Sequence, residues 1–296
     1  MGWFEDRGGL GGTVAVVTGG AGGLGEAIST DLAANGVKVA ALDIDPEAVA
    51  TLTATLDEQG ADALVVHGDA RDPEALEALF AAVDERWGRL DTLVNVVGGT
   101  FRAPFEDTRP KGWDSLLRIN LMHVLHACSL AIPRMKAGGR GGSIVNLTTI
   151  EAHRAAPGFA VYSAAKAAVE EFARTLAVEL APAGIRVNCV APDIAPTANM
   201  TRLAGGDLGP LSRPHGAEIA IPMGRVGRTT DVSGSVVFLA SGLSAYMTGT
   251  TLHPDGGTFA SSGWFNWPGS GWANHAPIEV LEMLGAQGVG DGGGDE

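Results

Sequence analysis

The chain has 296 residues, of which 45% are hydrophobic and 18% are charged, and its 34 acidic residues outnumber its 20 basic residues. This length suits one large domain or two small ones, and it is sufficient to bury a hydrophobic core without disulfides or metal ions. The net charge of −14 disfavours nucleic acid and anionic membrane surfaces as partners, because binding to either requires an excess of Lys and Arg.

Short apolar segments alternate with amphipathic segments along most of the chain. Strands are expected at residues 13–17, 37–43, 63–67, 91–97, 143–148, 185–190 and about 250–253. Helices are expected at residues 23–35, 46–59, 73–87, about 113–135, about 162–180 and about 230–240. Because these strands have no polar face, they predict a doubly wound α/β fold, in which helices cover both faces of a parallel sheet.

This alternation continues without a second domain boundary, so residues 1–258 are expected to form a single domain. Residues 193–222 suit a mobile apolar lid, because apolar side chains stand there among glycines and prolines: Met200, Leu203, Leu208, Leu211 and Ile219. Residues 259–296 are expected to be an aromatic extension with a disordered, Gly-rich end. Its aromatic side chains should be buried in a subunit contact or in the wall of an apolar pocket: Trp264, Phe265, Trp267 and Trp272.

Neither targeting nor metal-binding patterns stand out in the sequence. No apolar run approaches the ~20 residues of a membrane span, and the N-terminus does not resemble a secretory signal, so a cytoplasmic location is expected. Cys128 and Cys189 lie in apolar segments and are expected to be buried, reduced thiols. The histidines lack the spacing of a metal site, so no metal is expected.

The turn after the first strand is rich in glycine: Gly19, Gly20, Gly22, Gly23 and Gly25. Such a turn lets the backbone approach a pyrophosphate closely, while the following helix offers free N–H donors. Alone, the pattern also fits a flexible loop in a chain that is rich in glycine everywhere. Its position between a strand and a helix favours a dinucleotide-binding site.

Asp43 ends the second strand, close to the ~20-residue offset expected for an acid that binds the adenosine ribose. A carboxylate there accepts hydrogen bonds from ribose hydroxyls and repels a 2′-phosphate, which favours NAD over NADP. Neither the turn nor Ile44 and Asp45 supplies a basic residue for that phosphate. Alternatively, Asp43 or Asp45 caps the helix that begins at residue 46.

Tyr162 and Lys166 are four residues apart and therefore share one face of a predicted helix. A phenol has a reference pKa of ~10, so it needs assistance to act as a base at neutral pH. A neighbouring ammonium, together with the positive charge of an oxidised nicotinamide, should favour the phenolate. Without further context, such a pair is also consistent with an ordinary surface contact.

Several motifs in order resemble the short-chain dehydrogenase/reductase family of the Tyr-x-x-x-Lys type, over about residues 10–258. They are Thr18 with Gly19, Gly23 and Gly25, then Asp69, Asn95 with Gly98, Asn120, the hydroxyls of Thr148 and Thr149, Tyr162 with Lys166, Asn188 to Pro192, and Asp255 with Gly256 and Gly257. The resemblance implies that residues 1–258 form a Rossmann-like, dinucleotide-binding catalytic domain.

The resemblance also implies roles for individual residues. Tyr162 would be the acid and base, Lys166 would bind the nicotinamide ribose and lower the pKa of the phenol, Asn120 would hold a water in a proton relay, and Thr149 would orient the substrate. Asp69 would meet the adenine, and Ile194 and Thr197 would receive the carboxamide. The full set of expected cofactor contacts is Gly19, Gly23, Leu24, Gly25, Asp43, Ile44, Asp69, Ala70, Asn95, Gly98, Tyr162, Lys166, Pro192, Ile194 and Thr197.

Three positions depart from the family pattern. Thr149 replaces the usual serine, which adds a methyl group and stiffens the side chain. Val96 and Val97 replace an Asn-Ala pair, and Asp193 replaces a glycine. Asp193 either recognises a polar group of the substrate or shapes its turn. Glu151 and His153 are near enough in sequence to touch substrate, or they belong to a solvated loop.

These residues predict an NAD-dependent oxidoreductase that interconverts a secondary alcohol and its ketone. The apolar lid and the Trp-rich extension favour a cyclic or bulky apolar, hydroxysteroid-like substrate. The alternatives are an NADPH-dependent 3-oxoacyl-type reductase and a non-catalytic NAD-binding sensor or scaffold. The expected partners are a small-molecule alcohol or ketone and further copies of the chain, since members of the resembled family commonly form tetramers; a dimer or tetramer is expected.

Overall fold

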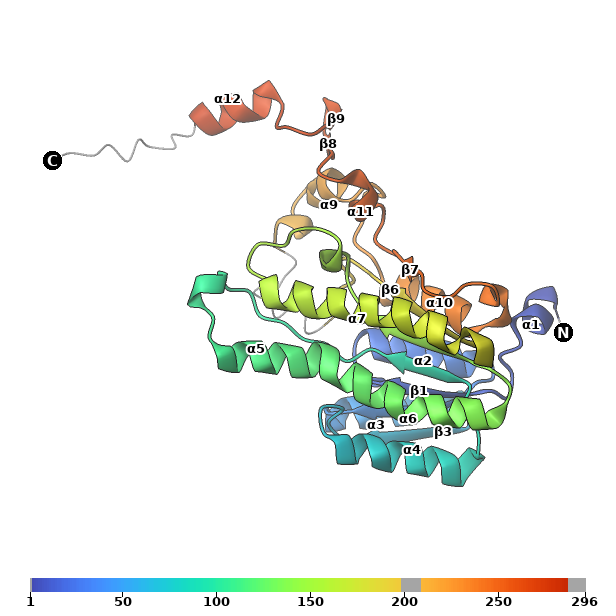
Figure 1. The fold of residues 1–296 in the computed structure, drawn as a ribbon. Coiled ribbons are helices and arrows are strands. Elements are labelled where there is room, and N and C mark those ends of the chain that lie inside the picture. Colours follow the sequence, from blue (N-terminus) through green and yellow to red (C-terminus); the bar gives the residue numbers. More distant parts are fainter. Residues whose placement is uncertain (1, 198–208, 287–296) are drawn as a thin grey trace.

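A seven-stranded parallel sheet organises the protein, with strand order β3-β2-β1-β4-β5-β6-β7 (Figure 1). The computed structural model describes residues 2–197 and 209–286. The strands are β1 (Val14–Thr18), β2 (Lys38–Asp43), β3 (Ala63–His67), β4 (Thr92–Asn95), β5 (Gly142–Leu147), β6 (Ile185–Val190) and β7 (Thr251–Leu252). The predicted doubly wound α/β class is confirmed, and the strand boundaries agree with the prediction to within two residues.

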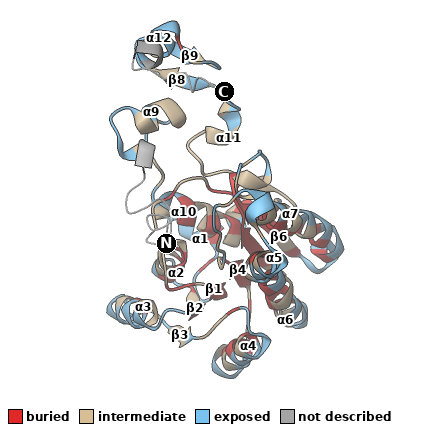
Figure 2. Cartoon of the chain, turned by 90° about the vertical axis from the view of Figure 1, so that its left-hand side faces the viewer, coloured by how far each residue is buried: buried red, intermediate tan, exposed pale blue. Residues whose placement is uncertain are grey.

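Helices cover both faces of this sheet. They are α2 (Leu24–Ala34), α3 (Pro46–Glu58), α4 (Pro73–Trp87), α5 (Pro110–Leu117), α6 (His123–Gly138), α7 (Ala160–Leu180) and α10 (Thr229–Ala240). Successive side chains of β1 point to opposite layers, as strand geometry requires. Val14 and Val16 pack with α4, α6 and α7, whereas Ala15 and Val17 pack with α2, α3 and α10. Figure 2 shows the buried residues concentrated in the sheet and on the helix faces that cover it.

The order of strands reverses on either side of β1, which is bonded to β2 on one edge and to β4 on the other. In open α/β sheets, this reversal leaves a crevice at the carboxyl ends of the strands, where ligands bind. The Gly-rich turn, Asp43 and Asn95 all lie at that end of the sheet. The fold therefore places these predicted cofactor-binding residues together at the carboxyl edge of the sheet.

One predicted helix is interrupted in the structure. The segment expected as a single helix at about 113–135 consists of α5, a π-helical turn at Arg118–Met122 and α6. A π turn widens the helix locally and is common at functional sites. This turn contains the buried Asn120.

The continuous stretch Pro110–Gly138 is long and apolar enough to cross a membrane by length and composition. This finding differs from the expectation that no segment reaches that length, because polar residues interrupt the apolar run without ending the helix. One face of the stretch lies in the hydrophobic core beneath the sheet, where Val124, Cys128 and Met135 are buried. Core helices of this kind satisfy the same criterion.

Short elements precede and follow the main sheet. They are α1 (Trp3–Gly8), α9 (Gly216–Ala220), α11 (Thr258–Ser261), the antiparallel hairpin of β8 (Phe265–Trp267) and β9 (Gly271–Ala273), and α12 (Ile278–Ala286). In Figure 1 the hairpin and α12 project away from the sheet. Trp264, Phe265 and Trp272 remain between about one third and one half exposed, so a single chain does not bury this aromatic cluster. The predicted disordered end and the lid residues Met200, Leu203 and Leu208 lie outside the described residues.

Candidate active site

The Gly-rich turn leaves no room for side chains at its narrowest point. Gly19 and Gly23 adopt positive φ angles of 65° and 55°, in the left-handed region that favours glycine. A Cβ atom placed on Gly25 would stand 1.8 Å from the Gly19 carbonyl oxygen. The amide of Gly19 donates to the Leu42 carbonyl oxygen at 2.7 Å, which holds the turn against β2. The free N-terminus of α2 above this turn fits a pyrophosphate.

A cavity of about 140 Å³ lies beside the turn. Its lining contains four residues expected to bind the adenosine half of a dinucleotide, namely Asp43, Ile44, Asp69 and Ala70. The Asp43 carboxylate accepts hydrogen bonds from the Ala21 amide at 3.0 Å and the Asp45 amide at 3.1 Å. Asp45, not Asp43, caps α3, through the amides of Glu47 and Ala48. Asp43 is therefore fixed between the turn and the cavity.

Arg71 also lines this cavity, and the sequence analysis did not identify it. Its guanidinium forms a salt bridge with Asp69, at 2.6 Å between Nη2 and Oδ2. The hydrogen bond from Arg71 holds the pKa of Asp69 below its usual value. Arg71 is distant in sequence from Asp43 and from the turn, and it follows β3, the strand next to β2.

At the other end of the crevice, Asn120, Gly98 and Lys166 meet. The Asn120 amide donates to the carbonyl oxygens of Gly99 at 2.8 Å and Leu116 at 3.0 Å, and it accepts from the Gly99 amide at 3.2 Å. A Cβ atom on Gly98 would lie 3.1 Å from Lys166 Nζ and 3.2 Å from Asn120 Oδ1. Glycine at 98 therefore allows the lysine and the asparagine to approach the same point.

Asn95 lies at the carboxyl end of β4, and its expected contact with the cofactor stays a prediction. Its side chain is buried, donates to Asn146 Oδ1 at 2.8 Å and thereby joins β4 to β5. It is absent from the residues that line the adenosine cavity, and its contacts indicate a structural role for the side chain.

Tyr162 and Lys166 lie on α7 with the predicted spacing, and the Thr149 side chain lies close enough to Tyr162 to lower the pKa of the phenol. Thr149 also caps the short 3-10 helix Ile150–Ala152 by accepting from the Glu151 amide at 3.3 Å. Lys166 is 3% exposed and donates from Nζ to the Leu147 carbonyl oxygen at 2.9 Å. The structure therefore brings Thr149, Tyr162 and Lys166 together at the end of β5.

Burial shifts the pKa values of both Tyr162 and Lys166 toward the neutral form of each side chain. Desolvation raises the pKa of Tyr162 to about 12, although the hydrogen bond with Thr149 acts in the opposite direction. Desolvation also lowers the pKa of Lys166 to about 8. In the protein alone, desolvation sets the direction of both pKa shifts, and a lowering of the phenol pKa by Lys166 stays a prediction.

The first part of the 193–222 loop crosses the Gly-rich turn. A Cβ atom on Gly23 would lie 3.0 Å from Thr197 Cγ2, so the Thr197 side chain packs directly against Gly23. The carbonyl oxygen of Pro192 accepts from the Ile150 amide at 3.2 Å, and that of Ile194 accepts from the Gly227 amide at 2.9 Å. These bonds place the start of the loop between the cofactor crevice and the segment of residues 148–153, which contains Thr149.

Asp193 lies in a cluster of charges at the start of this loop. Its carboxylate is 3.6 Å from Arg154 Nη2, and Arg154 in turn pairs with Glu151 at 2.8 Å. Burial raises the pKa of Asp193, while the charge of Arg154 and a hydrogen bond with Thr258 lower it. Because its partners belong to the protein, these contacts favour the interpretation that Asp193 shapes the loop.

The chain is similar to known proteins over most of its length. A family profile described as Enoyl-(Acyl carrier protein) reductase matches residues 19–258. The 3beta-hydroxysteroid dehydrogenase 1 of Eggerthella lenta is 36% identical over 250 residues, covering 84% of this chain and 94% of that protein. The 3-oxoacyl-[acyl-carrier-protein] reductase of Haemophilus influenzae is 33% identical over 250 residues, covering 84% and 99%. Carveol dehydrogenase from Mycobacterium avium, solved in complex with NAD, has a TM-score of 0.78 at 31% identity, covering 86% of this chain and 99% of that one.

The chain therefore belongs to the short-chain dehydrogenase/reductase family, as its motifs predict. It is an oxidoreductase of alcohols and ketones that binds a nicotinamide dinucleotide.

The variant Gly25→Ala tests the contribution of the turn. Because the added methyl group cannot fit beside the Gly19 carbonyl oxygen, we expect loss of NADH binding and a lower melting temperature. Gly234→Ala is the matched control, since a Cβ atom there meets no neighbour within 4 Å. Fluorescence titration with NADH and thermal denaturation measure both effects. Wild-type binding by Gly25→Ala would contradict the assigned geometry.

The burial of Lys166 predicts how the free energy of unfolding depends on pH. Between pH 8 and 10.5 the unfolded chain keeps the lysine proton that the folded protein has lost, so the free energy of unfolding rises with pH by up to about 3 kcal/mol. Lys166→Met removes this rise. Urea denaturation of the cofactor-free protein across this interval checks the prediction, and parallel curves for the two proteins would show that Lys166 titrates normally.

Proposed function

We propose that this oxidoreductase uses NAD(H) to interconvert a secondary alcohol and its ketone. The observation that carries the cofactor choice is the Asp43 carboxylate, held by two backbone amides at the rim of the adenosine cavity. A carboxylate in this position suits the ribose hydroxyls of NAD and repels the 2′-phosphate of NADP. The solved relative that contains NAD agrees with this choice.

In the proposed oxidation, the substrate hydroxyl lies between Thr149 and Tyr162. Thr149 orients the substrate oxygen, and the Tyr162 phenolate accepts the hydroxyl proton. When bound, the oxidised nicotinamide supplies the hydride acceptor and a positive charge beside the phenol. Lys166 donates toward the ribose and the phenol, and Asn120 holds a water through which the proton leaves. Reduction uses the same groups in the opposite direction.

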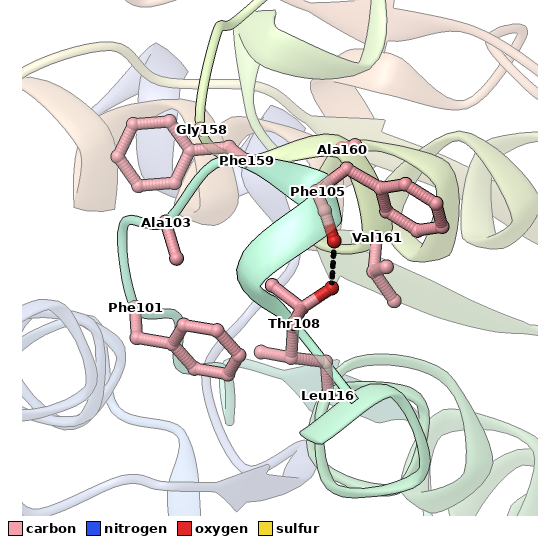
Figure 3. A pocket seen from close by; sticks show the side chains of 9 residues that line it. All are labelled: Phe101, Ala103, Phe105, Thr108, Leu116, Gly158, Phe159, Ala160 and Val161. Carbon is pink, nitrogen blue, oxygen red and sulfur yellow. Dashed lines mark hydrogen bonds between the residues drawn. The ribbon is translucent and has the colours of Figure 1, made fainter. Parts of the chain in front are cut away.

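The proposed substrate is a cyclic or bulky apolar alcohol. A small apolar pocket lies between the loop after β4 and the start of α7, and its aromatic side chains are Phe101, Phe105 and Phe159 (Figure 3). The Phe159 ring is 6.4 Å from the Tyr162 ring, so the pocket adjoins the proposed reaction site. The relatives named for a hydroxysteroid and for carveol act on cyclic alcohols by their names, which supports this class.

A second candidate is an NADPH-dependent 3-oxoacyl-type reductase. Arg71 favours it, because this cation lines the adenosine cavity and could pair with a phosphate. Against it, Arg71 is engaged by Asp69. A non-catalytic sensor is less well supported, because Thr149, Tyr162 and Lys166 occupy one site. The proposed enzyme is cytoplasmic and homo-oligomeric, with the exposed aromatic side chains of the extension as a candidate subunit contact.

Tyr162→Phe tests the proposed chemistry. We expect turnover to fall by at least about 100-fold while NADH binding is unchanged, because only the proton-transferring oxygen is lost. Tyr246→Phe is the matched control, since the other tyrosine of the chain is fully exposed. A screen of NAD⁺ against secondary alcohols, including cyclohexanol and a 3β-hydroxysteroid, is followed by NADH absorbance. Full turnover by Tyr162→Phe would refute the assignment.

Asp43→Ala tests the cofactor choice. Loss of hydrogen bonds to a charged acceptor, worth about 1.5–3 kcal/mol, should lower kcat/KM for NAD⁺ by about ten-fold to one hundred-fold and narrow the preference over NADP⁺. Asp45→Ala, which removes only the cap of α3, should leave the preference unchanged. A wild-type preference for NADP⁺ that disappears in Arg71→Ala would instead support the second candidate.

A further inference from the structure

A third ionisable residue of α7 lies next to the proposed site and has no role in the chemistry described above. Glu170 follows Lys166 by one helical turn, and its side chain is only 3% exposed. Burial of a carboxylate is costly unless other groups satisfy its oxygens. Here one oxygen accepts from the Thr148 hydroxyl at 2.8 Å, and the other lies 3.0 Å from His153 Nε2.

The two partners of Glu170 flank the segment that contains Thr149. Thr148 directly precedes Thr149, and His153 directly follows the 3-10 helix that Thr149 caps. Glu170 therefore fixes both ends of residues 148–153 from the same helix that carries Tyr162. His153 lies in an exposed stretch of chain, yet its side chain is only 22% exposed because it contacts Glu170.

Contacts of His153 extend to the segment after β7. Its ring centroid lies 4.8 Å from that of His253 and 5.2 Å from that of Phe259, and His253 stacks on Phe259 at 4.8 Å. His253 and Phe259 come from the chain that leads into the C-terminal extension. The Glu170 bonds thus hold together the Thr149 segment, the tyrosine helix and the base of the extension.

We propose that Glu170 is a positioning residue: by binding Thr148 and His153 it holds the Thr149 hydroxyl in the orientation that meets Tyr162 and the substrate. Buried ion pairs and buried charges contribute little to stability compared with apolar groups of the same size, so stability alone does not explain a carboxylate here. Its bonds converge on the backbone on either side of a residue with a stiff, β-branched side chain. This inference rests on the proposed function only in its effect on turnover.

The test compares Glu170→Met, which keeps the volume and removes both bonds, with Glu170→Gln, which can accept from Thr148 and donate to a neutral His153. Glu171→Gln is the matched control, because Glu171 is the next residue, is exposed and pairs only with Arg174 among the described residues. If Glu170→Met does not fold, Thr148→Val removes one of the two bonds and takes its place.

The first readout needs neither cofactor nor substrate. The chain has two tyrosines, so a Tyr246→Phe background labelled with ¹³C at the tyrosine Cζ gives a single resonance from Tyr162. This resonance reports the surroundings of the Tyr162 hydroxyl, which include the Thr149 side chain. We expect Glu170→Met to shift it, Glu170→Gln to restore it and Glu171→Gln to leave it unchanged. An unchanged resonance in Glu170→Met, or an equal shift in Glu170→Gln, would overturn the proposal.

The second readout is turnover of cyclohexanol or a 3β-hydroxysteroid with NAD⁺. Misplacement of an orienting hydroxyl should lower kcat by about ten-fold or more in Glu170→Met, with little change in NADH affinity and recovery in Glu170→Gln. A parallel loss of kcat and NADH affinity would indicate general damage and overturn the positioning role. If the wild-type protein oxidises no alcohol while the Tyr162 resonance still responds to Glu170, the proposed function fails and the positioning role stands.

Discussion

Removal of the Lys166 ammonium from water is the constraint on which the site depends. Lysine is 3% exposed here, and its Nζ has one carbonyl acceptor, from Leu147 at the end of β5. The position is enforced by α7, which packs across the sheet, and by Gly98, whose missing side chain leaves the space that Lys166 Nζ and Asn120 share. The fold thus places a desolvated amine beside Asn120 at the end of the crevice.

The same desolvation keeps the tyrosine protonated in the protein alone. With a pKa raised to about 12, Tyr162 is a poor base until another positive charge enters the crevice. In the proposed mechanism, removal of the substrate proton by Tyr162 is therefore coupled to cofactor binding. Such coupling follows from burial and requires no conformational change.

Much of the architecture could be predicted from the sequence. β3, β6 and α4 have the predicted boundaries, because apolar runs mark the two strands and the pair Asp72-Pro73 marks the start of α4. Asp43, Ile44, Asp69 and Ala70 line one cavity because each lies at or just after the carboxyl end of β2 or β3. The π turn at Asn120 could not be predicted, since hydrophobic periodicity does not distinguish one widened turn from a regular helix.

The properties missed from sequence depend on contacts between distant segments. The pKa values of Tyr162 and Lys166 are shifted by burial, which spacing along a helix does not specify. The bonds of Glu170 join residues about twenty positions apart, and Glu170 in a helix otherwise suggests a solvated face. The exposure of Trp264, Phe265 and Trp272 likewise could not be predicted, because it depends on the direction in which the C-terminal segment leaves the sheet.

The most direct test of this account is the titration of Tyr162, followed by the ¹³Cζ resonance in the Tyr246→Phe background, with and without NAD⁺. Without cofactor, we predict a midpoint well above the ordinary tyrosine value of about 10, and with NAD⁺ the midpoint should fall. A midpoint near the ordinary value that does not respond to NAD⁺ would contradict the central claim.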